Sequence, residues 1–182
     1  MKIWELRVDA DKFYCLTLVN DQEWNKFANM FDGRKLEASW EPFDVRIIDE
    51  KKRKKMGDAL YLSPNVPVLN LKALDAINDL IQPYVEILPL YSENGVLYAL
   101  NVINIIDCID YENAEFERYP DTGKIMWCKK YAFNKEALEG QHIFKTIDTP
   151  RSRALVSDEF RDRVQNKKLK GFEFVEVWSS GE

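Results

Sequence analysis

Apolar side chains recur at helical spacing in three parts of the chain. Trp24, Phe27 and Phe31 mark one face of a first helix, which we expect to begin at Asn20 and to end at Gly33. Two further helices should start at residues whose side chains can cap a helix N-terminus, and they end before a proline or in basic residues. These helices begin at Asn70 and Ser157, and they end before Pro83 and at Lys168.

Runs of β-branched and aromatic residues predict strands between these helices. Asn94-Gly95 is typical of the tight turn of a hairpin, and Pro89 favours an edge position for the strand before it. A second hairpin is expected to turn at 119–123, and Pro64 and Pro67 break the segment after residue 62. The predicted strands cover residues 13–19, 43–48, 59–62, 84–91, 96–102, 115–119, 124–133, 142–147 and 172–178.

These elements predict an α+β fold, a mostly antiparallel sheet with about three helices packed on it. The chain has 182 residues, of which 46% are hydrophobic and 31% charged, which is typical of an ordered globular protein. We therefore expect a single domain over residues 1–182, with room for two subdomains.

The longest apolar stretches are interrupted by Asn101 and Asn104, so none reaches the roughly 20 residues that span a bilayer. Lys2, Glu5 and Arg7 place charges where a secretory signal would be apolar. The expected location is therefore the cytoplasm, without membrane contact.

The formal net charge of -5 conceals an asymmetry. Five of the 26 basic residues lie in the run 51–55, which leaves 21 bases against 31 acids elsewhere. Acidic residues flank this run and no aromatic side chain interrupts it, so we interpret it as a solvated loop and expect no nucleic-acid partner. The three cysteines, Cys15, Cys108 and Cys128, have spacings that suit neither a disulfide framework nor a zinc site.

Catalytic and cofactor-binding motifs are missing from the sequence, so we expect neither an enzyme nor a cofactor. The single histidine, His142, would need a nucleophile brought close by the fold, and the alternative is a structural histidine in a strand. The five tryptophans lie in segments where packing in the core is the simpler role. They are Trp4, Trp24, Trp40, Trp127 and Trp178.

The densest group of acidic residues follows residue 106. Its spacing does not match a calcium-binding loop, because isoleucine and tyrosine occupy positions that must supply oxygen ligands. Two interpretations stay open, a solvated loop and a contact surface for a basic partner. The candidate partner-binding residues are Asp107, Asp110, Glu112, Glu115 and Glu117.

Four segments carry a resemblance to a known family. The residues 101–110, 142–145, 155–160 and 169–174 resemble the eleventh numbered immunity-protein family of bacterial polymorphic toxin systems, formerly a domain of unknown function. The resemblance implies a cytoplasmic protein that binds a cognate toxin and protects the producing cell, without cofactor or turnover. It implies that residues 1–182 form one such domain, and it leaves the toxin and the oligomeric state open.

Two other functions remain as alternatives. A hydrolase of unassigned type would need His142 or several carboxylates to converge in a pocket. A scaffold or regulatory binding module unrelated to toxins would need only a stable fold and a complementary surface.

Overall fold

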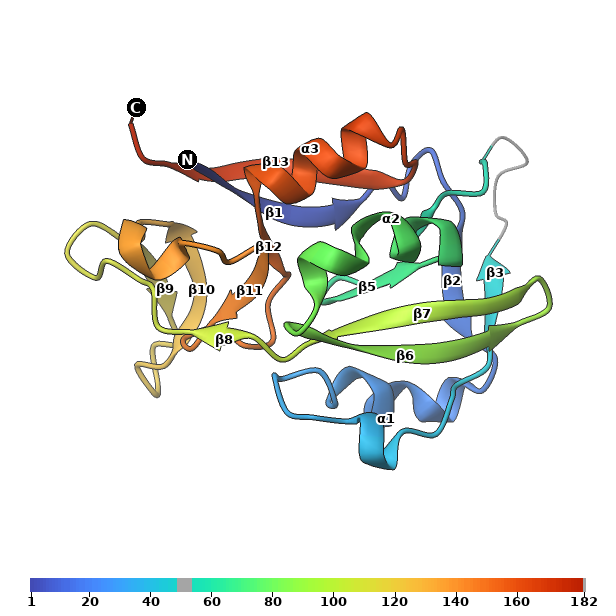
Figure 1. Ribbon diagram of the computed structural model, residues 1–182. Coiled ribbons are helices and arrows are strands. Elements are labelled where there is room, and N and C mark those ends of the chain that lie inside the picture. Colours follow the sequence, from blue (N-terminus) through green and yellow to red (C-terminus); the bar gives the residue numbers. More distant parts are fainter. Residues whose placement is uncertain (49–53, 182) are drawn as a thin grey trace.

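The protein has an α+β fold, as the sequence predicts. The structure is a computed structural model that describes residues 1–48 and 54–181, in which three α-helices and thirteen strands are present (Figure 1). The helices are α1 (Trp24–Ala28), α2 (Leu71–Ile81) and α3 (Asp158–Asn166). The strands are β1 (Lys2–Val8), β2 (Cys15–Leu18), β3 (Val45–Ile48), β4 (Ala59–Ser63), β5 (Val66–Leu69), β6 (Val85–Ser92), β7 (Gly95–Val102), β8 (Ile105–Ile106), β9 (Glu115–Arg118), β10 (Ile125–Lys130), β11 (Ile143–Thr146), β12 (Leu155–Ser157) and β13 (Phe172–Ser179).

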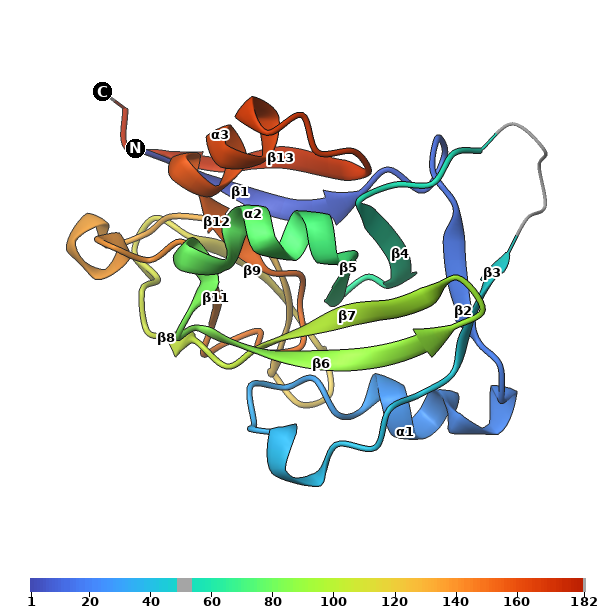
Figure 2. The same ribbon diagram turned by 45° about the vertical axis from the view of Figure 1, so that its right-hand side comes forward.

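A six-stranded sheet, with the strand order β3-β2-β4-β5-β7-β6, forms one half of the body. Its pairs are antiparallel except for β2 with β4. The segment of α1 covers one face, where Phe27 and Phe31 pack with Leu88 of β6, and α2 covers the other (Figure 2). This sheet is therefore buried on both faces.

A five-stranded sheet, with the order β13-β1-β12-β11-β8, forms the other half. Strand β1 pairs with both β12 and β13, so the first and last strands of the chain lie side by side (Figure 1). The helix α3 packs on this sheet through Phe160 and Val164 and also contacts α2. The two helices thus join the sheets through one shared core.

The strands β9 and β10 form a separate two-stranded sheet. It packs on the face of the five-stranded sheet that is turned away from α3, where Phe133 contacts Phe144 and Trp178. In Figure 1 this hairpin stands apart from α2 and the six-stranded sheet.

The helices α2 and α3 confirm the predicted caps. The side chain of Asn70 accepts a hydrogen bond from the backbone N–H of Ala73, and that of Ser157 accepts one from Phe160. The first helix is shorter than predicted, because a 3₁₀ turn over Asp21–Glu23 precedes α1 and α1 ends at Ala28 rather than near residue 33. The Asn29 side chain donates to the carbonyl of Asn25, and the turn that follows lets Phe31 enter the core beside Phe27.

Both predicted hairpins are present, and β6 lies at a sheet edge as Pro89 indicated. Four strands were not predicted: β1, β5, β8 and β12. Strand β5 contains Pro67, which lies opposite a register shift between Leu60 and Ser63 of β4, where a missing N–H is tolerated. Strands β8 and β12 have two and three residues, too few to show a period.

Candidate partner-binding surface

The predicted acidic residues lie on a twisted β-ribbon, which we define as residues 107–134. Beyond the ladder of β9 and β10, the backbone N–H of Asp110 donates to the carbonyl of Ala132 at 3.0 Å, and that of Asn134 donates to Cys108 at 2.9 Å. Residues 110–114 form a turn inserted into the first strand of this ribbon. The fold therefore brings the five predicted residues onto one element.

The carboxylate of Asp110 is used by its own turn. It accepts the backbone N–H of Glu112 at 3.1 Å and the side-chain amide of Asn113 at 2.7 Å. The hydrogen bond from Asn113 holds the pKa of Asp110 below its usual value. We interpret Asp110 as the residue that shapes the turn, because its carboxylate fixes the backbone two residues further on and the side chain of Asn113.

Two other predicted residues form ion pairs across the ribbon. Glu117 pairs with Lys129, and an oxygen of Glu115 lies 4.0 Å from the ammonium of Lys130. All four side chains are at least 39% exposed, so each pair contributes only about 0–1 kcal/mol to stability. These carboxylates stay accessible to a partner.

Asp107 and Glu112 are exposed and have no ion pair within residues 1–48 and 54–181. Between them lies Tyr111, whose hydroxyl donates to the carboxylate of Asp148 at 2.9 Å. Desolvation and this hydrogen bond raise the pKa of Tyr111 to about 12, and the nearby charge of Asp107 acts in the same direction. The electrostatic potential at this end of the ribbon is therefore negative.

Trp127 corrects the prediction that all five tryptophans are packed. Its surface is 51% exposed, whereas Trp4, Trp24, Trp40 and Trp178 are half-buried against the clusters of the core. Cys128, the next residue, is buried and lies opposite Phe116 of β9 on the face that packs on the body. Side chains alternate along a strand, so Trp127 points to the outer face.

His142 lies close to a hydroxyl group. Its Nδ1 is 3.0 Å from the Oγ of Ser157, and its Nε2 is 3.8 Å from a carboxylate oxygen of Glu159, beside a cavity of about 220 Å³. The same Ser157 oxygen caps α3 by accepting the N–H of Phe160. The carboxylate lies beyond hydrogen-bond distance from the ring, so this arrangement describes a helix cap supported by histidine.

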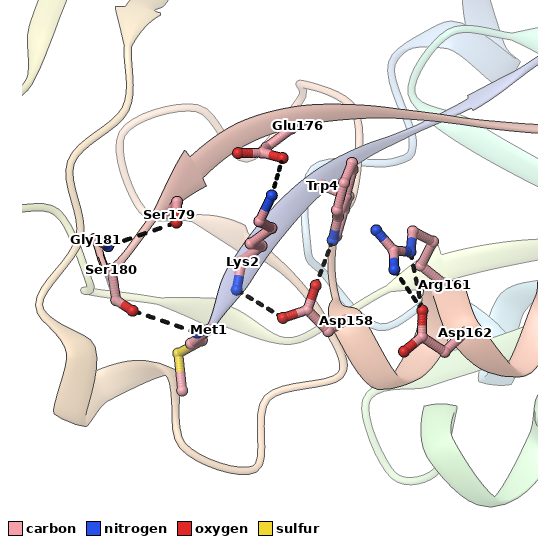
Figure 3. Close-up of polar contacts among 10 residues, drawn as sticks. All are labelled: Met1, Lys2, Trp4, Asp158, Arg161, Asp162, Glu176, Ser179, Ser180 and Gly181. Atoms are coloured by element: carbon pink, nitrogen blue, oxygen red, sulfur yellow. Dashed lines mark hydrogen bonds and ion pairs between the residues drawn. The ribbon is translucent and has the colours of Figure 1, made fainter.

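The start of α3 is also tied to β1. Asp158 accepts the backbone N–H of Lys2 at 2.7 Å and the indole N–H of Trp4 at 2.9 Å (Figure 3). The guanidinium of Arg161 lies 4.3 Å from the centre of the Trp4 ring, and Lys2 pairs with Glu176 of β13. These contacts give Lys2, Asp158 and Arg161 structural roles where α3 packs beside β1.

The basic run and the cysteines, the other features considered as chemical sites, form no site in the described structure. The run 51–55 falls partly outside the described residues, and Lys54 donates to the carbonyl of Ala10 at 2.8 Å. The three cysteines are free. In the part of the chain that the structure describes, no group of three or more His, Cys, Asp or Glu side chains could hold a metal ion, and no helix has the length and apolar character to cross a bilayer.

Comparisons with known proteins give one result that bears on function. No curated protein matches the chain. The immunity protein family (Imm11) matches residues 89–179, which is half of the chain and includes the whole ribbon, the His142 segment and α3. This match agrees with the resemblance found in the motifs of the sequence, and the chain belongs to the immunity protein family (Imm11).

Proposed function

We propose that this protein binds a cognate protein toxin in the cytoplasm of the producing cell and neutralises it without turnover and without a cofactor. Membership of the immunity protein family supports this function, and the matched segment 89–179 is the observation that carries it. We further propose that residues 1–182 act as one domain, which the pairing of β1 with β13 supports.

The proposed contact surface is the acidic side of the ribbon. Its accessible charges are the exposed carboxylates of Asp107 and Glu112, together with Glu115 and Glu117 in their exposed ion pairs. A negative surface of this kind favours a basic partner and accelerates its association, and salt weakens the attraction. We assign Asp110 an indirect role, because its carboxylate holds the turn that presents Glu112.

Co-expression with the product of the adjacent gene tests the proposal, since an immunity gene normally lies beside its toxin gene. We expect the two proteins to co-purify and the growth of toxin-expressing cells to be restored. Failure of both would refute the proposal.

Charge reversal tests the surface separately. We expect Glu112→Lys to slow association with the toxin and to reduce its dependence on salt. Glu93→Lys is the matched control, because Glu93 is an exposed acid in the turn between β6 and β7, on a different sheet. Equal association rates and salt dependence for the two variants would remove the acidic side of the ribbon from the interface.

A hydrolase is the second candidate, and the contact between His142 and Ser157 is the observation in its favour. It predicts an ester- or amide-cleaving activity that is lost in His142→Ala. A binding module unrelated to toxins predicts neither this activity nor rescue of growth. The three functions therefore give different outcomes in the same pair of assays.

A further inference from the structure

Besides Trp127, the outer face of the ribbon has a second exposed aromatic residue, Tyr119. Trp127 lies opposite Glu117 in the ladder between β9 and β10. The same alternation, carried past the end of β9, places Tyr119 on the face of Glu117, and Tyr119 is 46% exposed. Its backbone N–H donates to the carbonyl of Lys124, so the ribbon is still paired at this position.

A β-bulge adds a third apolar side chain. The register shifts between Ile125 and Trp127, and Met126 is 41% exposed although it precedes an outward-facing residue. In a regular strand these two neighbours would point to opposite faces. We name the three exposed residues Tyr119, Met126 and Trp127 the apolar tip.

We propose that the apolar tip is the anchor of the toxin interface, inserting Trp127 into an apolar pocket whose rim is basic; this inference rests on the proposed function. Tryptophan and tyrosine dominate the binding energy of protein interfaces when they enter desolvated pockets. Glu117, which lies opposite Trp127 in the ladder, forms an ion pair with Lys129.

Charge favours a basic partner over a second copy of this chain. Over residues 107–134 the ribbon has six acids and four bases, a balance of -2. In a two-fold symmetric contact the same patch faces itself, so these carboxylates would oppose one another. A toxin with basic groups around its pocket would instead compensate them.

Substitution of Trp127 tests the inference with the purified toxin domain encoded by the adjacent gene as the probe. We expect Trp127→Ala to raise the Kd in titration calorimetry at least about 30-fold, the effect of a hot-spot residue, and Trp127→Phe to raise it less. Tyr91→Ala is the matched control, because Tyr91 is 50% exposed but lies in β6. Thermal unfolding of each variant reports whether the fold is retained.

Two further measurements keep the test decisive. Acrylamide should quench the Trp127 fluorescence, obtained as the difference between the wild type and Trp127→Phe, in the free protein but not in the complex. If the wild type binds the toxin but Trp127→Ala and Tyr91→Ala have equal Kd values, this inference alone is overturned. The same holds if acrylamide still quenches the Trp127 fluorescence in the complex. If the wild type does not bind the toxin, both this inference and the proposed function are overturned. If light scattering shows a dimer that is lost in Trp127→Ala, the partner of the apolar tip is a second copy of this chain and not the toxin.

Discussion

Removal of the amino group of Lys145 should stabilise the protein at neutral pH. Lys145 lies in β11 and is 2% exposed, and its Nζ donates to the carbonyl of Asn65 at 3.3 Å. Burial lowers the pKa of this lysine from 10.5 to about 8, and the negative charge of Asp32 only partly opposes the effect. At pH 7 the folded protein therefore holds a protonated amine in an environment that disfavours its charge.

The magnitude follows from the difference between these pKa values. A shift from 10.5 to about 8, at 1.36 kcal/mol per unit, lowers the free energy of unfolding at pH 7 by about 3 kcal/mol. Loss of the long hydrogen bond to Asn65 offsets about 1 kcal/mol, so Lys145→Met should be more stable than the wild type by about 2 kcal/mol.

The pH dependence has a defined sign. Below pH 8 both states of the wild type carry the proton and the unfavourable effect is complete. Between about pH 8 and 10.5 the unfolded state binds more protons than the folded state, so the wild-type stability rises with pH. The advantage of Lys145→Met should therefore shrink by about 2–3 kcal/mol between pH 7 and pH 10.

Urea unfolding of both proteins at several pH values measures this difference directly. Lys35→Met is the control for removal of a positive charge, because Lys35 is exposed. A difference between Lys145→Met and the wild type that stays constant from pH 7 to pH 10 would refute the reasoning, as would destabilisation at pH 7.

Three further predictions concern stability and thiol reactivity. Asp158→Ala should lower the free energy of unfolding, measured by urea denaturation, by about 2–3 kcal/mol, because two N–H groups of β1 lose their acceptor. Gly171→Ala should lower the thermal midpoint far more than Gly140→Ala, because both residues have positive φ but a Cβ at Gly171 would lie 2.2 Å from a backbone oxygen of β4. Cys108 and Cys128 should react with a thiol reagent at pH 8 only after unfolding, because burial raises their pKa values to about 12 and about 11.

The sequence predicted those elements whose determinants are local. Asn70 and Ser157 cap their helices within three residues, and Asn94-Gly95 closes its hairpin with two, so no distant contact is needed. Strand β12 becomes a strand only because β1 and β11 pair with its three residues. Its partner β1 lies at the other end of the chain, and no local pattern reports this pairing.

The candidate surface was predictable in part for the same reason. Acidic residues are visible in the sequence, but whether a carboxylate is free depends on the folded turn, which uses Asp110 and leaves Glu112 exposed. The exposure of Trp127 did have a local indicator. Lys129 lies two residues further along the same strand, and a charged side chain at that spacing indicates a solvent-facing side.

The residues that hold the ribbon to the rest of the molecule and the residues of the proposed contact surface lie on different faces of the ribbon. Phe133 holds the ribbon to the body through its contacts with Phe144 and Trp178 on the inner face. Trp127 and Glu112 are exposed and belong to none of the three clusters of the core, so substitutions there leave the packing of the clusters in place. For the proposed toxin-binding function this separation is an advantage, because outward residues of the ribbon can change while the sheets and helices keep their packing.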